Sequence, residues 1–308
     1  MRKQNDIQKK SSRFKLAFAI VLLLLLIIIS SFLLIIDRSS YKAGETVIYN
    51  AAAQRLFKKA DELKKEDFAK FTELDLSGKM LTDLRPLKKF TNLRKLNLGK
   101  PYGPDGTKIV LPKWKTTLAK FKFLNISEEN VVDLRGLKKL SALESLDLTQ
   151  RQIKNTKALS GLNNLRELIL RDTNIEDLTP IRKLKNLQIL YLSSTPVKNL
   201  EPLKELTNLQ KLYLINTKVS SLEPLNNLKK LRILQLYDVK VLDIEPIKDL
   251  KNLEELWINA DLLSDIEFIR NFPKMKSLGL INPGNAKIDW MKLMELKDSM
   301  PGLQIYSR

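Results

Sequence analysis

Residues 187–208 read LQILYLSSTPVKNLEPLKELTN, and residues 209–230, directly after them, read LQKLYLINTKVSSLEPLNNLKK. Both stretches have leucine at the first, fourth and sixth positions, and both contain Leu-Glu-Pro-Leu at the same place. A unit of this length copied in tandem is typical of repeat proteins, in which each unit packs on its neighbours. These two stretches therefore decide the fold class.

The same pattern, L-x-x-L-x-L-x-x-x-x-I/V-x-x-L/I-x-P-L/I-x-x-L-x-N, recurs along most of the chain. Its ten starts are Phe71, Leu93, Phe121, Leu143, Leu165, Leu187, Leu209, Leu231, Leu253 and Met275. Consecutive starts are 22 residues apart, except that the step from Leu93 to Phe121 is 28 residues. We therefore expect leucine-based repeats over residues 71–288, with a six-residue insertion near 99–108.

The spacing has a physical explanation. In Leu-x-Leu the two leucines point to one face of a short strand, and the residue between them points to the other. The later apolar positions turn inward as the chain loops back, so each repeat adds one apolar layer that only its neighbours can bury. Proline also recurs where its fixed φ can begin a short helical turn without an N–H partner. These prolines are Pro86, Pro180, Pro202, Pro224 and Pro246.

The pattern resembles the leucine-rich-repeat family, and its threonine-containing form is similar to the repeats of bacterial internalins. Thr173, Thr195 and Thr217 stand where many leucine-rich repeats carry an asparagine ladder. The resemblance covers residues 71–306 and implies an α/β repeat solenoid: a right-handed horseshoe with a parallel concave sheet and short 3-10 or irregular convex turns. It also implies binding and not catalysis. The sequence contains no Leu-Pro-x-Thr-Gly sorting signal, so the resemblance does not extend to adhesin function.

Both ends of a solenoid need a cover. Residues 47–70 have apolar side chains at helical spacing opposite Lys and Glu, which predicts an amphipathic N-terminal capping helix. Residues 289–308 predict a helix that ends before Pro301. The motif Met300-x-x-Leu303-x-Ile305 then restarts the strand pattern, which predicts an eleventh, closing strand.

The N-terminal region predicts a membrane anchor. Residues 16–36 form an uncharged apolar run, long enough as a helix to span a hydrocarbon core of roughly 30 Å. A cleaved signal peptide is the alternative, but its apolar core is usually shorter and ends at a small-x-small site. The tail over residues 1–15 is basic, whereas charges in the linker over 37–46 are balanced. This asymmetry predicts a single-pass cell-membrane protein with a cytoplasmic N-terminus and an extracytoplasmic repeat domain.

The composition argues against catalysis. The chain has no Cys and no His, which excludes Cys/His zinc sites, Cys nucleophiles and histidine-based acid–base chemistry. No Gly-rich phosphate loop or clustered carboxylate pair is evident. We therefore expect a protein that is not an enzyme and has no cofactor, no catalytic residue and no metal site.

The net charge of +19 raises an alternative function. Residues 1–70 hold 14 Lys/Arg and 7 Asp/Glu, which leaves 40 and 28 for the rest, a net charge of +12. Such a surface could serve as a receptor for an anionic envelope polymer or another polyanion. However, lysine pairs such as Lys88-Lys89 and Lys229-Lys230 recur at one repeat position and do not cluster. Nucleic acid is not an expected partner.

The third, fifth and seventh positions of each repeat are expected to face the concave surface. At the fifth position the first four repeats carry Asp75, Asn97, Asn125 and Asp147, whereas the later repeats become apolar and aromatic. The expected partner-binding residues are Ile169, Ile189, Tyr191, Tyr213, Ile215, Ile233, Tyr237 and Trp257.

These side chains predict recognition of a protein or peptide. Parallel strands lie about 4.8 Å apart, so the fifth positions from residue 169 to 257 extend over roughly 19 Å. Tyr and Trp are also the residue types that dominate interface energetics. Two alternatives stay open: an aromatic ladder that only stabilises neighbouring strands, and self-association.

Overall fold

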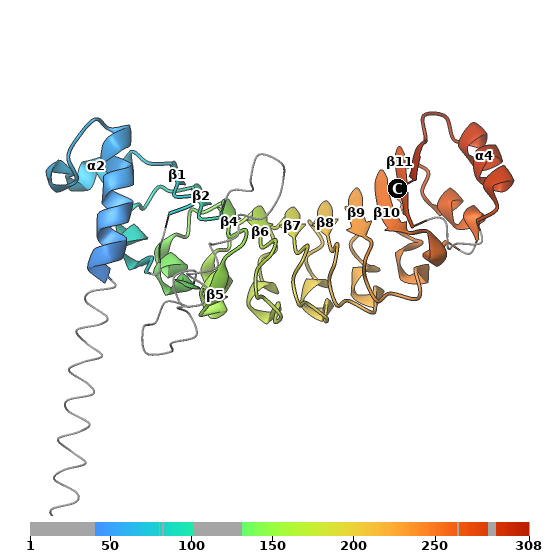
Figure 1. Ribbon diagram of the computed structural model, residues 1–308, viewed down its shortest axis with the longest axis horizontal. Helices are drawn as coiled ribbons and strands as arrows, with labels where there is room; N and C mark the ends of the chain where they lie inside the picture. Colours follow the sequence, from blue (N-terminus) through green and yellow to red (C-terminus); the bar gives the residue numbers. More distant parts are fainter. Residues whose placement is uncertain are drawn as a thin grey trace, which may run out of the picture.

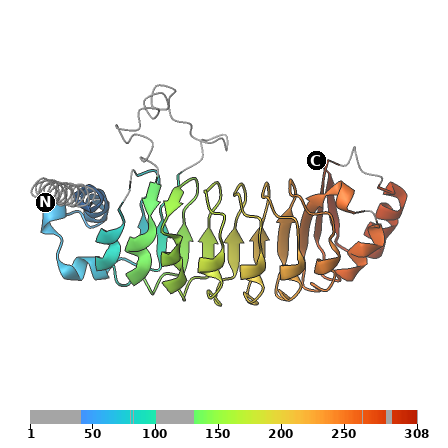
Figure 2. The same cartoon turned by 90° about the horizontal axis from the view of Figure 1, so that it is seen from below.

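The computed structural model describes residues 41–79, 81, 83–100, 131–263, 265–282 and 288–307. Over these ranges the chain forms an elongated, gently curved solenoid with its repeats side by side (Figures 1 and 2). Strands line one side of the solenoid and 3-10 helices line the other. This arrangement confirms the predicted leucine-rich-repeat solenoid with a parallel sheet.

One sheet runs the length of the solenoid. In order, its ten strands within the described residues are β1 (Glu73–Asp75), β2 (Lys95–Asn97), β4 (Ser145–Asp147), β6 (Glu167–Ile169), β7 (Ile189–Tyr191), β8 (Lys211–Tyr213), β9 (Ile233–Leu236), β10 (Glu255–Asn259), β11 (Ser277–Ile281) and β12 (Gln304–Ser307). All neighbours are parallel and pair position for position, for example Leu190 with Leu212. A second, two-stranded sheet pairs β3 (Val131–Asp133) with β5 (Gln152–Lys154).

Short 3-10 helices form the opposite side. They are η2 (Arg85–Lys89), η5 (Leu134–Lys139), η6 (Thr156–Gly161), η7 (Thr179–Ile181), η8 (Glu201–Leu203), η9 (Glu223–Leu225), η10 (Glu245–Ile247), η11 (Ala260–Leu262) and η12 (Ile266–Asn271). A proline is the second residue of η2, η7, η8, η9 and η10, as the sequence predicts. The missing N–H costs nothing there, because the first turn of a helix has no partner for it.

The core is a stack of apolar layers. In the repeat that starts at Leu187, the side chains of Leu190, Leu192, Val197 and Leu203 are completely buried. The other repeats contribute matching layers, so the core is continuous from the N-terminal helix to α4 (Trp290–Ser299). Each layer is covered by its two neighbours, which makes the stability cooperative between repeats.

Asparagine, not threonine, links the repeats through side-chain hydrogen bonds. The amide of Asn186 donates to the carbonyl of Asn163, 2.9 Å away in the preceding repeat, and Asn208 donates equivalently to Lys185. The hydroxyl of Thr195, in contrast, donates to Leu192 O within its own repeat. Threonine therefore caps a buried carbonyl within its own repeat, at the position where many leucine-rich repeats carry an asparagine ladder.

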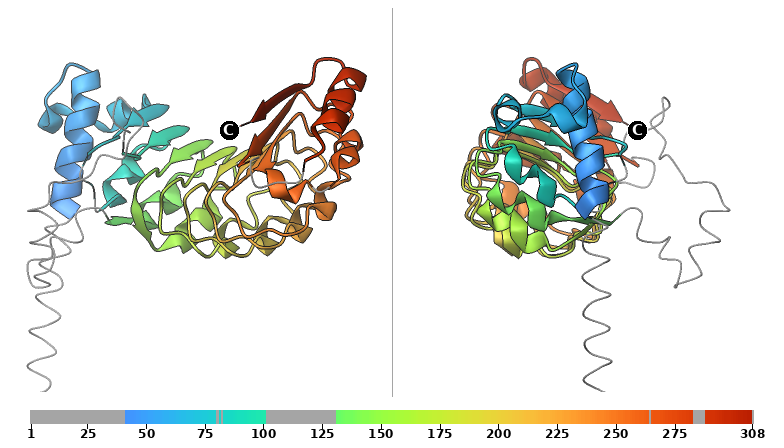
Figure 3. Two further views of the ribbon diagram at one scale, coloured as in Figure 1. Left: turned by 45° about the vertical axis from the view of Figure 1, so that its right-hand side comes forward. Right: turned by 90° about the vertical axis from the view of Figure 1, so that its left-hand side faces the viewer.

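The N-terminal cover differs from the predicted helix over 47–70. A helix occupies residues 41–55, including part of the expected linker, and lies across the end of the solenoid (Figure 3). It ends where Phe57 adopts a positive φ of 55°. The chain then forms η1 (Ala60–Glu62) and the short α2 (Lys65–Ala69).

The buried carboxylate of Asp67 organises the segment that follows the helix. It accepts hydrogen bonds from the ammonium groups of Lys58 and Lys70 and from the backbone N–H of Lys64. These bonds lower the pKa of Asp67 far below its usual range. The carboxylate thereby ties together residues 58–70, the segment that follows the helix.

The fold-class prediction needs a correction, because it included a transmembrane helix. No helix within the described residues is long and apolar enough to cross a membrane. The described part of the N-terminal helix, residues 41–55, carries the charged residues Lys42, Glu45 and Arg55. The predicted segments 1–15 and 16–36 lie outside the described residues.

The sheet also corrects the prediction of ten repeats. β2 pairs directly with β4, with Lys95 opposite Ser145 and Asn97 opposite Asp147, so no strand starting at Phe121 lies between them. Residues 93–100 and 131–142 form one repeat, and the interrupting residues 101–130 lie outside the described residues. The insertion is therefore larger than the six residues predicted near 99–108.

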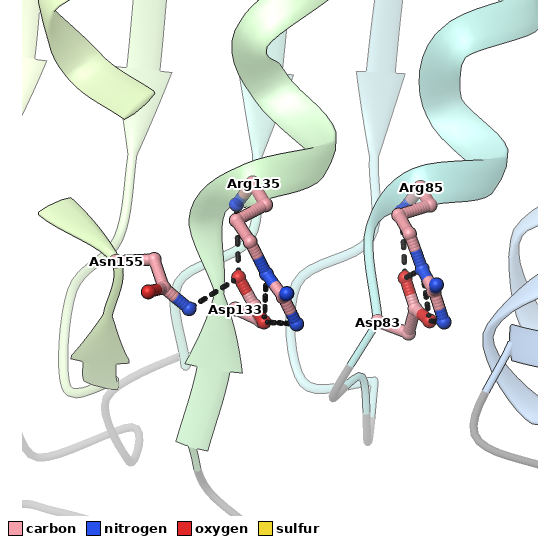
Figure 4. A network of polar contacts seen from close by, with 5 residues as sticks. All are labelled: Asp83, Arg85, Asp133, Arg135 and Asn155. Carbon is pink, nitrogen blue, oxygen red and sulfur yellow. Dashed lines mark hydrogen bonds and ion pairs between the residues drawn. The ribbon is translucent and has the colours of Figure 1, made fainter. Parts of the chain in front are cut away.

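Matching ion pairs beside η2 and η5 show that the first repeat and the interrupted repeat are neighbours. Asp83 accepts hydrogen bonds from the backbone N–H and the guanidinium of Arg85, and Asp133 does the same with Arg135 (Figure 4). Asp133 also accepts a 3.0 Å bond from Asn155 in the next repeat. Asp83 and Asp133 form a parallel bridge. The Asp-x-Arg motif thus repeats in space although its two copies are 50 residues apart.

Two further residues close the junction. A Cβ at Gly136 would lie 2.1 Å from the carbonyl carbon of Leu84, so only glycine lets η5 approach η2 this closely. Arg151 is 1% exposed, and its guanidinium donates to the carbonyls of Leu98 and Lys79 in the two preceding repeats. Arg151 therefore satisfies the Leu98 carbonyl, which corresponds to the carbonyl that threonine caps in the later repeats.

At the C-terminal end, α4 covers the last layer with Leu293 and Leu296, and β12 then adds the closing strand. The register differs from the sequence pattern, which aligns Leu303 with Leu278. In the structure Ile305 pairs with Leu278, and Tyr306 lies beside Gly279.

Candidate partner-binding surface

The fifth positions of successive repeats form a row across the concave sheet. This fifth-position row runs over β6 to β12 and consists of Ile169, Tyr191, Tyr213, Gln235, Trp257, Gly279 and Tyr306. In β1, β2 and β4 the same position carries Asp75, Asn97 and Asp147. The predicted change from polar to apolar residues is therefore present along one continuous sheet.

The tyrosines of β7 and β8 stack on each other. The ring centroids of Tyr191 and Tyr213 are 4.1 Å apart, and the rings are nearly parallel, with an interplanar angle of 2°. Burial, with smaller contributions from Tyr191 and Glu255, raises the pKa of the Tyr213 hydroxyl above its usual value. The stack fixes both rings before any partner arrives, so binding loses less side-chain entropy.

Trp257 is held by three neighbours. Its indole N–H donates to Glu255 Oε1 at 3.0 Å, and Gln235 Nε2 donates to the same oxygen at 2.8 Å. The indole covers Gly279, where a Cβ would lie only 2.1 Å from a ring carbon. Beyond Gly279 it stacks on Tyr306 at 5.8 Å. The row thus holds two aromatic stacks separated by Gln235.

The other four predicted site residues flank the row. Ile189 in β7 and Ile233 in β9 occupy the third position of their repeats, and they lie on either side of Lys211 in β8. Ile215 and Tyr237 lie at the seventh position of their repeats. Their carbonyl oxygens accept backbone N–H hydrogen bonds from the preceding repeat. The structure thus brings all eight predicted residues onto one face. Each is half-buried. Their role in binding a partner stays a prediction.

Half-burial gives the aromatic rings a structural role as well. The aromatic rings face away from the core, but they pack on one another, so their removal also affects the stability of the sheet. The most exposed aromatic residue of the row is Tyr306, at 47%. Sequence reasoning missed Tyr306, because the pattern placed Gln304 and not Tyr306 beside Gly279.

The N-terminal half of the sheet has a different chemistry. A hollow of about 610 Å³ opens there, bordered by the helix over 41–55 and by polar side chains of β1, β2 and β4. Asp75 and Asp147 use their carboxylates to accept backbone N–H bonds from Ser77 and Thr149. Among the described residues no group of three acidic side chains could hold a metal ion. Asn125, the fourth polar residue predicted here, lies outside the described residues.

Comparison with known proteins identifies the repeats. The family model described as Leucine Rich repeats (2 copies) matches residues 163–205. No curated protein matches the chain. Internalin C2 of Listeria monocytogenes has a similar structure, with a TM-score of 0.53 and 24% identity over 69% of this chain and 92% of its own. An internalin F structure from the same organism has a TM-score of 0.41 and 21% identity over 85% and 90% of the two chains. The likeness to internalin C2 establishes a shared fold.

Proposed function

We propose that this internalin-like leucine-rich-repeat protein binds a protein or peptide along the C-terminal half of its concave face. One observation carries the proposal. The fifth position of the repeats changes from Asp75, Asn97 and Asp147 to the aromatic stacks around Tyr191 and Trp257. Leucine-rich repeats are binding modules, and this row is where the face becomes apolar.

The chemistry of the row fits a macromolecular partner. Aromatic side chains of this kind bury about 150–250 Å² each, and they dominate interface energetics. The predicted residues extend over five neighbouring strands, β6 to β10, so they form an elongated surface and not a single pocket. A small molecule would cover only part of such an extended row.

Binding of an anionic polymer is the alternative, because residues 71–308 carry a net charge of +12. On the opposite side of the solenoid Lys185 lies 2.6 Å from Glu205, and Lys198 lies 2.8 Å from Glu176. Such pairs balance single charges, but the net charge already counts their carboxylates. Salt separates the two functions, because polyanion binding weakens strongly with ionic strength whereas aromatic contacts do not.

A site-specific photocrosslinker tests the proposal. We expect a crosslinking amino acid at position 215, beside Tyr213, to capture a defined protein or peptide upon irradiation in cells. The same amino acid at position 204, an exposed site of the repeat next to η8, is the control and should capture nothing equivalent.

Variants then locate the contact. Replacing Tyr213 by alanine should weaken binding of the captured partner by about 2 kcal/mol or more if it is a true anchor. Asp75→Ala changes the same face in the polar half and should have little effect. Equal capture at positions 204 and 215, or full binding by Tyr213→Ala, would refute the proposal. Capture of a second copy of the chain would assign the row to self-association.

A further inference from the structure

Charged side chains on the concave sheet are nearly all paired. At the third position Glu73 lies 2.7 Å from Lys95, and Glu167 accepts a 2.7 Å bond from the Ser145 hydroxyl. Further along the sheet, Glu255 accepts from its two neighbours through Oε1. Because each charge has a partner, none of these residues requires one from outside.

Lys211 is the exception. Within the described residues its ammonium has no hydrogen bond, ion pair or ring contact. Lys211 is half-buried, and its partners in register on the adjacent strands are Ile189 and Ile233. Glu255 and Glu167 are each two strands away, on the order of 9–10 Å across the sheet. Their carboxylates accept hydrogen bonds from Trp257 and Ser145. The ammonium therefore stands alone in the middle of the apolar surface.

An apolar partner would have to bury this charge. Burying an ammonium group without a counter-ion is costly, because its hydration is lost and nothing replaces it. The four-carbon stem of lysine can lie between the two isoleucines while the charged end points outward. A carboxylate placed opposite this end would offset the cost and give the interface a fixed register.

We infer that the partner presents a carboxylate to Lys211 while apolar or aromatic side chains of the same segment cover the Tyr191–Tyr213 stack. The inference rests on the proposed function and specifies its partner as an acidic peptide segment with adjacent apolar residues. The carboxylate belongs to an Asp or Glu side chain or to a free C-terminus. Lys211 then determines specificity, and the tyrosines supply most of the affinity.

A random peptide library displayed on phage tests this inference with the full-length chain as bait. We expect the selected peptides to contain an Asp, a Glu or a C-terminal carboxylate within a few residues of an aromatic or large aliphatic residue. Synthetic versions of these peptides should bind Lys211→Glu at least about tenfold more weakly than the unaltered chain. Lysine in place of the acidic residue should restore binding to Lys211→Glu.

The matched control is Lys218→Glu, which makes the same charge change at an exposed position of the same repeat, outside the strand. It should bind the peptides as the unaltered chain does. Peptides that need Tyr213 but bind Lys211→Glu with full affinity would overturn the inference and leave the proposed function intact. In that case Lys211 only keeps the apolar surface soluble. If no selected peptide depends on Tyr213, the proposed function fails as well.

Discussion

At the scale of single residues, the contact between Trp257 and Gly279 depends on a missing side chain. We expect Gly279→Ala to push the indole off β11, since its Cβ would lie 2.1 Å from the ring. Overpacking of this kind typically costs about 1–3 kcal/mol. Tryptophan fluorescence and near-UV circular dichroism should change, and urea unfolding should shift to lower concentration.

The control for this prediction is Gly161→Ala. A Cβ at Gly161 would find its nearest atom at 3.8 Å, so the same substitution meets no obstacle there. Unchanged fluorescence in Gly279→Ala would mean that the indole does not lie over β11, and the stack with Tyr306 would have to be abandoned.

At the scale of one repeat, burial couples each strand to its neighbours. The side chain of Leu212 is completely buried between the layers of β7 and β9. Leu212→Ala should cost about 2–5 kcal/mol. Hydrogen exchange should accelerate in the adjacent repeats as well as in β8, because each layer is covered by the next.

Leu242→Ala provides the comparison, since Leu242 is 91% exposed in the following repeat. We expect a change within about 0.5 kcal/mol there. A loss below about 1 kcal/mol for Leu212→Ala would mean that the inward and outward positions have been exchanged. The assignment of the concave row would then fail with them.

The N-terminal cover should be sensitive to acid. Hydrogen bonds from Lys58, Lys64 and Lys70 hold the pKa of Asp67 below its usual value of about 4. A carboxylate whose pKa is lowered in the folded state contributes stability at higher pH and loses it as the pH falls through this range. Protection of the amides in the helix over 41–55, measured against the intrinsic exchange rate at each pH, should therefore fall with acidification below about pH 4.

Asp67→Asn should show faster exchange in this helix already at neutral pH and a weaker dependence on acid. Asp61→Asn removes an exposed carboxylate of η1 and should behave like the unaltered chain. A helix whose protection follows the same acid profile in Asp67→Asn would show that the carboxylate does not hold the cover in place.

At the scale of the whole molecule, the sequence predicts the regular part of the solenoid well and its irregular parts poorly. From Leu143 to Met275 the period determines strand register, the positions of the prolines and the buried leucines, because each layer must match the next. The repeat pattern does not predict that Lys211 lacks an ion-pair partner among the described residues, because this depends on which ion pairs and hydrogen bonds the other charged residues form. The segment after the first helix is held by hydrogen bonds to Asp67, which no periodicity reveals.

Periodicity also misled the prediction at Phe121. Residues 121–126 read FKFLNI and match the strand pattern 22 residues before Leu143, yet β2 pairs directly with β4. The true relation lies in the Asp-x-Arg motifs at Asp83 and Asp133, which become adjacent only in three dimensions. A local pattern cannot distinguish a repeat from a segment that resembles one.

The same junction yields the last prediction. Lys100 stands at the eighth position of its repeat and Val131 at the eleventh, so residues 101–130 replace the two residues found between these positions elsewhere. Replacing 101–130 by Thr-Lys, as at Thr217 and Lys218, should preserve the solenoid, since Arg151 and Gly136 already close the junction. The far-UV circular dichroism spectrum should keep its shape, and thermal unfolding should stay cooperative with a midpoint within about 5 °C of that of the unaltered chain.

A variant with residues 101–130 in shuffled order keeps the length of the segment and changes its sequence, and it should also fold. If the shortened chain loses cooperative unfolding while the shuffled chain retains it, the junction requires the length of this segment. If both chains lose it, residues 101–130 contribute specific contacts to the core. The description of residues 93–100 and 131–142 as one interrupted repeat would then be wrong.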